Sequence, residues 1–133
     1  MKKSDLVDRW TILQMKARFD KNAKIEVLKY NDEIIEMIYL FGYPQDKYDN
    51  AVDFITSVMK LMEANSKIWQ LEASIRQEYS TDDQAKEVLS MAEIGRRALA
   101  IRDLNKLRNE AKKEIDMLYG EITDNKVDHA SSE

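Results

Sequence analysis

Four polar or aromatic side chains recur at helical spacing in the middle of the chain. Asn65, Trp69, Glu72 and Arg76 are separated by steps of four, three and four residues, which places them on one stripe of an α-helix. Burial of a carboxylate or a guanidinium group is costly unless the group is paired or hydrogen-bonded. The stripe therefore predicts a satisfied polar network, a ligand site or a subunit interface.

A second cluster follows in the sequence Leu104-Asn105-x2-Arg108-Asn109, and its polar residues share a stripe with Lys112. We regard Asn105, Arg108 and Asn109 as further ligand or interface candidates. Between Arg96 and Lys113 there are seven Lys and Arg residues against two Asp and Glu residues. This basic run favours a solvated face, partly neutralised by Asp46, Asp49 and Asp53 on the neighbouring helix; the alternative is a site for a small anionic or sugar-phosphate ligand.

Carboxylates at helical spacing suggest a different chemistry. Glu33 and Glu36 are three residues apart, and Asp46, Asp49 and Asp53 follow at steps of three and four. Helical bundles hold divalent metals with such inward carboxylates. The pattern resembles the Glu-rich helices of all-α nucleoside triphosphate pyrophosphohydrolases, although the doubled glutamate and the later Glu-x-x-Asp element of that family are missing. A metal-dependent nucleotide hydrolase using Glu33, Glu36, Asp49 and Asp53 is therefore our alternative hypothesis, and solvated faces are the preferred interpretation.

Other site classes lack the residues that they need. His129 is the only histidine, no cysteine is present, and no Gly-rich phosphate loop occurs. These facts exclude disulfides and thiolate sites, disfavour a histidine triad, and lead us to expect no cofactor. They leave any catalytic residue unidentified and agree with a cytoplasmic location.

The overall charge and hydropathy restrict the partners. The formal net charge is −4, whereas nucleic-acid binding usually requires a surplus of Lys and Arg. Charged residues interrupt every apolar stretch before it reaches the length of a signal peptide or a membrane span. We therefore expect no nucleic-acid partner, no export and no membrane span.

The elements that position these residues are predicted to be helices, because only three glycines and one proline interrupt 133 residues. Ser4 is expected to cap a first helix that ends near Phe19. A second helix follows the polar break at residues 20–22 and stops at Gly42-Tyr43-Pro44. Its predicted buried residues are Ile25, Leu28, Ile35, Ile38 and Phe41.

Two long helices, about 46–79 and 82–119, are predicted to form an antiparallel hairpin that completes an all-α, four-helix-bundle-like fold. A heptad-like seam marks the first of them, and a capping box from Thr81 to Gln84 marks the start of the second. Gly120 is expected to end the second helix, so residues 1–120 form one domain and 121–133 a flexible tail. The predicted seam consists of Tyr48, Val52, Ile55, Met59, Met62, Trp69 and Ala73.

A turn at Thr81 sets the register of this hairpin. It places Arg97 near Asn65, which makes Arg97 a candidate as well, and Arg108 beside Asp53. The Trp69 and Arg108 clusters would then lie roughly 30 Å apart at ~1.5 Å rise per residue. Each cluster is therefore expected to form a local network, unless a second copy of the chain brings the two together.

Together, the motifs Asn65-x3-Trp69-x2-Glu72-x3-Arg76 and Leu104-Asn105-x2-Arg108-Asn109 resemble those of an uncharacterised bacterial family of small helical proteins. That family is known only as a domain of unknown function and is often associated with cell-surface glycan genes. The opening, Leu6 to Lys16, looks like the start of a related family with a Leu-Ile-Asp-Lys-x-Thr-Ile-Leu pattern. This sequence carries Ala73 where those families usually have Asp. The resemblance implies a helical fold but no known reaction.

The long hairpin outreaches the two shorter helices, so part of its apolar seam should stay uncovered in a monomer. Uncovered seams usually mark self-association, and we therefore expect a homodimer. The preferred hypothesis is an accessory or binding module that acts through self-association and an unidentified partner or small anionic ligand.

Overall fold

The computed structural model describes residues 1–42, 48–76 and 89–131, and their side chains for 1–40, 50–76 and 89–120. The described residues form four helices and no strand, which confirms the predicted all-α class. The helices are α1 (Lys3–Lys16), α2 (Lys21–Gly42), α3 (Tyr48–Arg76) and α4 (Met91–Ser131).

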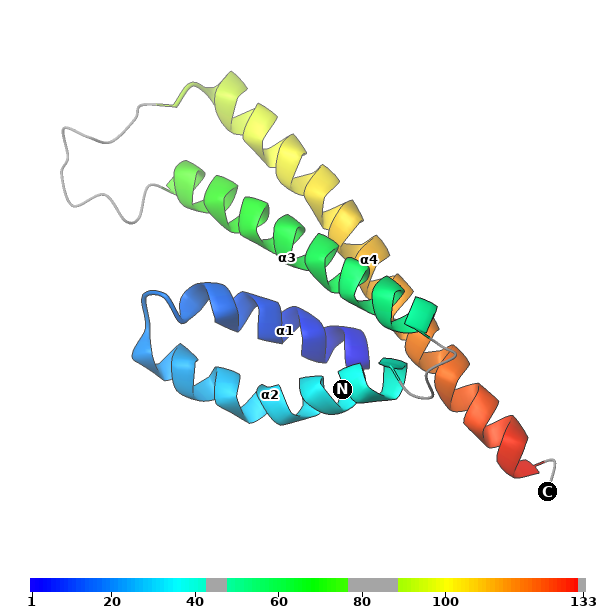
Figure 1. Cartoon of the computed structure of the whole chain (residues 1–133). Helices are drawn as coiled ribbons and strands as arrows, with labels where there is room; N and C mark the ends of the chain where they lie inside the picture. The colour runs from blue at the N-terminus through cyan, green and yellow to red at the C-terminus, as the bar shows by residue number, and fades with distance from the viewer. Residues whose placement is uncertain (43–47, 77–88, 132–133) are drawn as a thin grey trace.

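The helices pack as two antiparallel pairs (Figure 1). The short helices α1 and α2 form an N-terminal hairpin, and α3 and α4 form the long hairpin that was predicted. Helix α1 packs against all three others. The core cluster draws residues from every helix: Leu6, Val7, Ile34, Met37, Phe54, Leu61, Ala111 and Ile115.

Local side-chain hydrogen bonds define two of the helix starts. The backbone N–H of Asn22 donates to Asp20 Oδ1 at 2.9 Å, so the predicted polar break begins α2. The backbone N–H of Glu93 donates to Ser90 Oγ at 3.1 Å and caps α4. Ser4, by contrast, lies inside α1, which begins without a side-chain cap. The predicted Ser4 cap is therefore wrong. The predicted cap at Thr81 lies outside the described residues.

The ends of α2 and α4 test the two predicted glycine stops. Helix α2 ends at Gly42 as expected, but α4 continues through Gly120 to Ser131. A glycine inside a helix costs only about 1 kcal/mol relative to alanine, so neighbouring helix-forming residues outweigh it. Residues 121–131 are therefore part of α4, and Gly120 does not end the helix as expected.

The buried faces of α2 and α3 are not the predicted ones. Val27, Ile34 and Met37 are buried in α2, and Phe54, Leu61 and Ala64 in α3. Eight of the residues predicted to form the buried faces are instead exposed: Ile25, Leu28, Ile35, Ile38, Val52, Ile55, Met59 and Met62. Trp69 and Ala73 are partly buried, and the side chains of Phe41 and Tyr48 lie outside the described ones. The prediction assumed that α3 packs mainly on α4. In the structure α3 also packs on α1 and α2, and its inward stripe includes small and polar residues such as Ser57 and Asn65.

None of the four described helices is long and apolar enough to cross a membrane.

Candidate functional site

A buried carboxylate on α1 connects three helices. Asp8 is only 5% exposed and accepts hydrogen bonds from Arg108 Nε at 3.0 Å and Nη2 at 2.5 Å. The side-chain amide of Asn65 donates to Asp8 Oδ1 and to Thr11 Oγ1, each at 2.9 Å. Thr11 Oγ1 donates in turn to the Asp8 carbonyl oxygen at 2.7 Å. The network is satisfied, and no buried side-chain nitrogen or oxygen among the described residues lacks a partner.

The electrostatics of this network favour ionised Asp8. Burial alone raises the pKa of the carboxyl group, but the hydrogen bonds from Arg108 and Asn65 outweigh burial and hold the pKa below its usual value. The same contact raises the pKa of Arg108. The pair therefore stays charged over the physiological pH range and fixes α1 to α4.

Two further contacts fix the beginning of α1 against α4. Lys112 Nζ lies 2.8 Å from Asp5 Oδ1. Ser4 Oγ donates to Asp116 Oδ2 at 2.7 Å, and the Ser4 backbone N–H donates to Asp116 Oδ1 at 3.1 Å. Part of the basic run of α4 is thus neutralised from α1. Of the Asp residues expected to neutralise it, Asp53 is exposed, and the side chains of Asp46 and Asp49 lie outside the described ones.

The two sequence clusters meet in one place, contrary to the prediction of a separation near 30 Å. Asn65 of α3 and Arg108 of α4 bind the same Asp8 carboxylate. The register differs because α4 begins at Met91, so residues further along α4 lie beside a given residue of α3. Glu114, for example, accepts a hydrogen bond from Ser57 at 2.7 Å. The predicted Arg108–Asp53 pair is also wrong, since Arg108 pairs with Asp8.

Beside this network lies an open groove of about 1110 Å³, near the turn between α1 and α2. Its apolar lining includes Ile12, Met15, Ile68 and Trp69. The ring of Phe19 packs edge-on against Trp69 with a centroid distance of 6.0 Å and an interplanar angle of 88°. Six of the candidates predicted from the sequence line the groove: Asn65, Trp69, Glu72, Arg76, Asn105 and Arg108.

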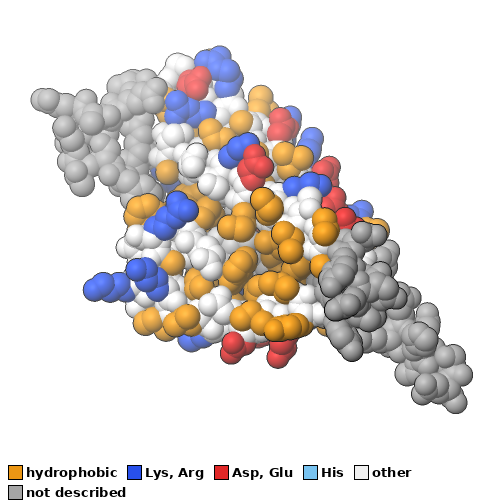
Figure 2. Space-filling view, in the orientation of Figure 1, with side chains coloured by type: hydrophobic (Ala, Val, Ile, Leu, Met, Phe, Trp, Pro, Cys, Tyr) orange, Lys and Arg blue, Asp and Glu red, His pale blue; other side chains and the backbone are white. Residues whose placement is uncertain are grey.

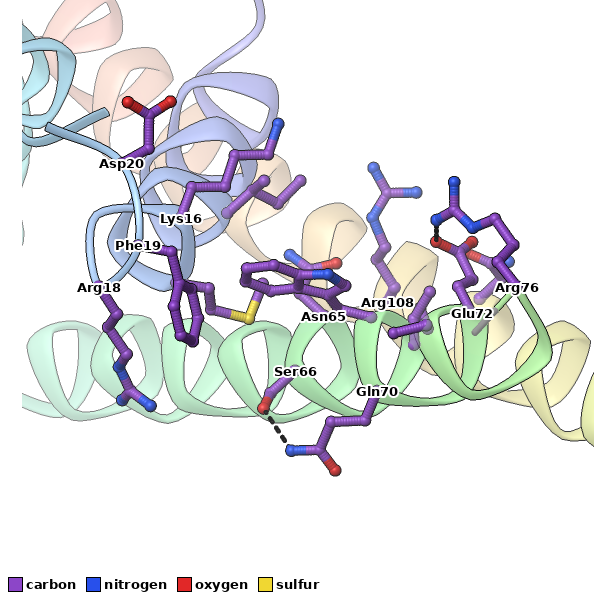
Figure 3. A pocket seen from close by; sticks show the side chains of 16 residues that line it. Lys16, Arg18, Phe19, Asp20, Asn65, Ser66, Gln70, Glu72, Arg76 and Arg108 are labelled. Atoms are coloured by element: carbon purple, nitrogen blue, oxygen red, sulfur yellow. Dashed lines mark hydrogen bonds and ion pairs between the residues drawn. The ribbon is translucent and has the colours of Figure 1, made fainter. Parts of the chain in front are cut away.

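Cations from two sides of the fold line the groove (Figure 3). Lys16 and Arg18 come from the end of α1 and the turn that follows it, and they form no ion pair with a described residue. Arg76 lies on α3 with a nitrogen 3.5 Å from Glu72 Oε2, and both side chains are about half exposed. Together with Arg108 these make four cations. The three nearby carboxylates are Asp20, Glu72 and Asp8, so the groove has a small positive excess on a chain whose net charge is −4.

The remaining two candidates lie outside the groove lining. Arg97 pairs with Glu93 at 3.0 Å within α4, and Asn109 is exposed. The alternative metal set is not assembled either. Glu33, Glu36 and Asp53 are exposed, the side chain of Asp49 lies outside the described ones, and no group of three or more metal-binding side chains occurs among the described residues.

The α1 side of the site was not predicted from the sequence. Ser4, Asp8 and Thr11 follow one another at steps of four and three, the same pattern that identified the α3 stripe. All three are buried. Their polar types at helical spacing are the signal that could have identified Asp8 and Thr11. Lys16 and Phe19 carry no such signal, because their positions depend on how the α1–α2 turn packs against α3.

Comparison of the chain with protein-family models, curated proteins and solved structures found no match. The resemblance of its motifs to an uncharacterised bacterial family stays a prediction.

Proposed function

We propose that this chain is a cytoplasmic accessory module, a homodimer that binds a small organic anion such as a sugar phosphate in the groove beside Trp69. The observation that carries the ligand proposal is the pairing of an apolar, aromatic lining with cations on two sides of one open groove. Trp69 offers a flat surface for a sugar or other ring. Arg76, Lys16 and Arg18 offer donors for a phosphate or carboxylate.

The Asp8 network supports this proposal by positioning the groove. Asp8 and Asn65 hold α1 against α3 and α4, so the cations that follow α1 stay close to the α3 stripe. Arg108 is occupied by Asp8 and serves as a wall of the groove. Anion binding is therefore assigned to Arg76, Lys16 and Arg18.

Thermal melting with defined probes tests the ligand proposal. A ligand that binds only the folded chain raises the unfolding midpoint, by on the order of several degrees at a large excess over Kd. We expect glucose 6-phosphate to raise the midpoint more than glucose or inorganic phosphate alone, since each of those probes engages half of the groove. Equal midpoints with all three probes would contradict the proposal.

Matched variants locate the binding. Trp69→Ala and Arg76→Gln should remove the shift caused by glucose 6-phosphate. Arg102→Gln is the control, because Arg102 is an exposed cation of α4 that lies outside the groove lining. A shift that survives both groove substitutions, or that disappears in the control, would place the ligand elsewhere.

The same thermal melts also test the enzyme hypothesis. Nucleotide with Mg²⁺ or Mn²⁺ is an additional condition, and the exposed Glu33, Glu36 and Asp53 predict no shift with it. A midpoint raised by micromolar metal, and lost in Glu36→Gln, would favour the metal-dependent nucleotide hydrolase over the binding module.

A further inference from the structure

Eight large aliphatic or methionine side chains of α2 and α3 are exposed in the single chain. We name them the apolar face: Ile25, Leu28, Ile35, Ile38, Val52, Ile55, Met59 and Met62, with exposed fractions from 39% to 67%. Figure 2 shows hydrophobic side chains gathered in a broad patch over the region where α2 and α3 lie. Residues that reach water in a monomer are rarely apolar over so wide an area.

The size of the apolar face matches one side of a stable dimer. A large apolar residue exposed by about half leaves on the order of 100 Å² in contact with water, so eight leave on the order of 800 Å². That area is about what each partner contributes to an interface of standard size. A small ligand would cover only part of it.

The spacing on α3 favours a second copy of this chain as the occupant. Val52, Ile55, Met59 and Met62 follow one another at steps of three, four and three, so the stripe has the same spacing in both directions. In an antiparallel pair of α3 helices, Val52 therefore lies opposite Met62 of the other copy, and Ile55 opposite Met59. A two-fold axis requires this kind of self-complementarity.

The stripe on α2 has the same property. Ile25, Leu28, Ile35 and Ile38 follow at steps of three, seven and three, and their midpoint lies between residues 31 and 32. The midpoint of the α3 stripe is residue 57. Helices α2 and α3 are antiparallel neighbours (Figure 1), and the sequence between them is centred on residue 45. The midpoint of the α2 stripe lies between 13 and 14 residues before residue 45, and the midpoint of the α3 stripe lies 12 residues after it. The two midpoints are thus nearly level, and one axis serves both helices.

We propose that the apolar face is the interface of an antiparallel, two-fold symmetric dimer in which α2 and α3 of each copy pack on α2 and α3 of the other. This inference rests on the self-association in the proposed function and adds the surface and its symmetry.

Substitutions on and off the apolar face test which surface is used. Ile55→Glu and Met59→Glu each place a carboxylate next to the axis and should convert the dimer to a folded monomer, measured by light scattering. Leu107→Glu is the matched control, because Leu107 of α4 is 56% exposed but lies outside the apolar face. It should keep the dimeric mass. Circular dichroism establishes that each variant remains helical.

Cross-linking tests the symmetry without disturbing the fold. The chain has no cysteine, so Val52→Cys and Met62→Cys each introduce a single thiol. In the antiparallel arrangement the two Val52 positions lie ~15 Å apart along the helices, too far for a disulfide, whereas Val52 lies beside Met62 of the other copy. Mixing the two variants should therefore give several-fold more cross-linked dimer on oxidation than either variant alone.

Each outcome bears on a different part of the proposal. A monomeric wild-type chain would overturn self-association altogether. A dimer that persists in both face variants, or is lost in Leu107→Glu, would leave self-association standing and overturn the apolar face as its surface. More cross-linking in Val52→Cys alone than in the mixture would overturn the antiparallel arrangement. Ligand-induced melting shifts are scored separately, so failure of the groove and failure of the interface are distinguishable.

Discussion

Asp8 is the residue on which the packing of α1 depends most. Its side chain is 7% exposed and ion-paired with Arg108, whose side chain is 27% exposed. Asp5 provides a matched comparison, because it also pairs from α1 to a cation of α4 but is 42% exposed. The two carboxylates differ mainly in burial, and burial decides what their loss costs.

Replacement of Asp8 should be far more destabilising than replacement of Asp5. Asp8→Ala removes the counter-charge of a largely buried guanidinium group and two acceptors, so the free energy of unfolding should fall by roughly 2–4 kcal/mol. Asp5→Ala should cost less than about 1 kcal/mol, as expected for an exposed pair. Urea denaturation of both variants measures the difference. Equal losses would mean that the Asp8 network contributes little beyond a surface ion pair.

The low pKa of Asp8 also predicts how stability depends on pH. Since the pKa is lower in the folded chain than the ordinary value of 3.8, the stabilisation is fully present above that value and is lost as the pH falls through the folded-state pKa. Thermal midpoints should therefore drop between about pH 5 and pH 2, and Asp8→Asn should flatten this decrease. An identical pH profile in wild type and Asp8→Asn would refute the assignment.

At the scale of elements, periodicity predicted the helices better than their faces. A second helix was predicted between the polar break at residues 20–22 and Gly42, where α2 lies, and the long hairpin was also predicted. The buried face of α3 was wrong because Val52, Ile55, Met59 and Met62 form a cleaner apolar stripe than the inward one, which includes Ser57 and Asn65. Hydrophobic spacing identifies an apolar stripe on a helix, but it does not show whether that stripe is buried within the same chain.

The prediction of the site had the same limit: helical spacing identified its residues but not how they lie relative to one another. The Asn65 to Arg76 stripe and Arg108 were recognised from polar residues at helical spacing, and the groove brings them together. Their separation was predicted wrongly because the register of α3 on α4 depends on where α4 begins. Ser90, which caps α4, is followed three residues later by Glu93, and this capping-box pattern would have located the start.

Gly120 offers a test of the length of α4. In the structure it lies inside the helix, and a Cβ placed there would meet no atom within 4 Å. Gly120→Ala should therefore stabilise the chain by about 0.5–1 kcal/mol. A glycine that ended the helix in the left-handed conformation would give the opposite sign, so destabilisation in urea would show that α4 stops at Gly120.

At the scale of the whole molecule, the two binding features lie on different parts of one small fold. The Asp8 network holds α1 in place and forms the groove, whereas the apolar face spans α2 and α3. The groove variants Trp69→Ala and Arg76→Gln should therefore keep the oligomeric state of the wild-type chain. Coupled loss of ligand binding and self-association in either variant would contradict this separation.

The most direct test of the central claim, that a second copy covers the apolar face, is the mass of the wild-type chain in solution. The chain has a mass of 15.6 kDa. Sedimentation equilibrium at micromolar concentrations should give twice that value, with dissociation only on dilution. A mass of 15.6 kDa at every concentration would contradict the account.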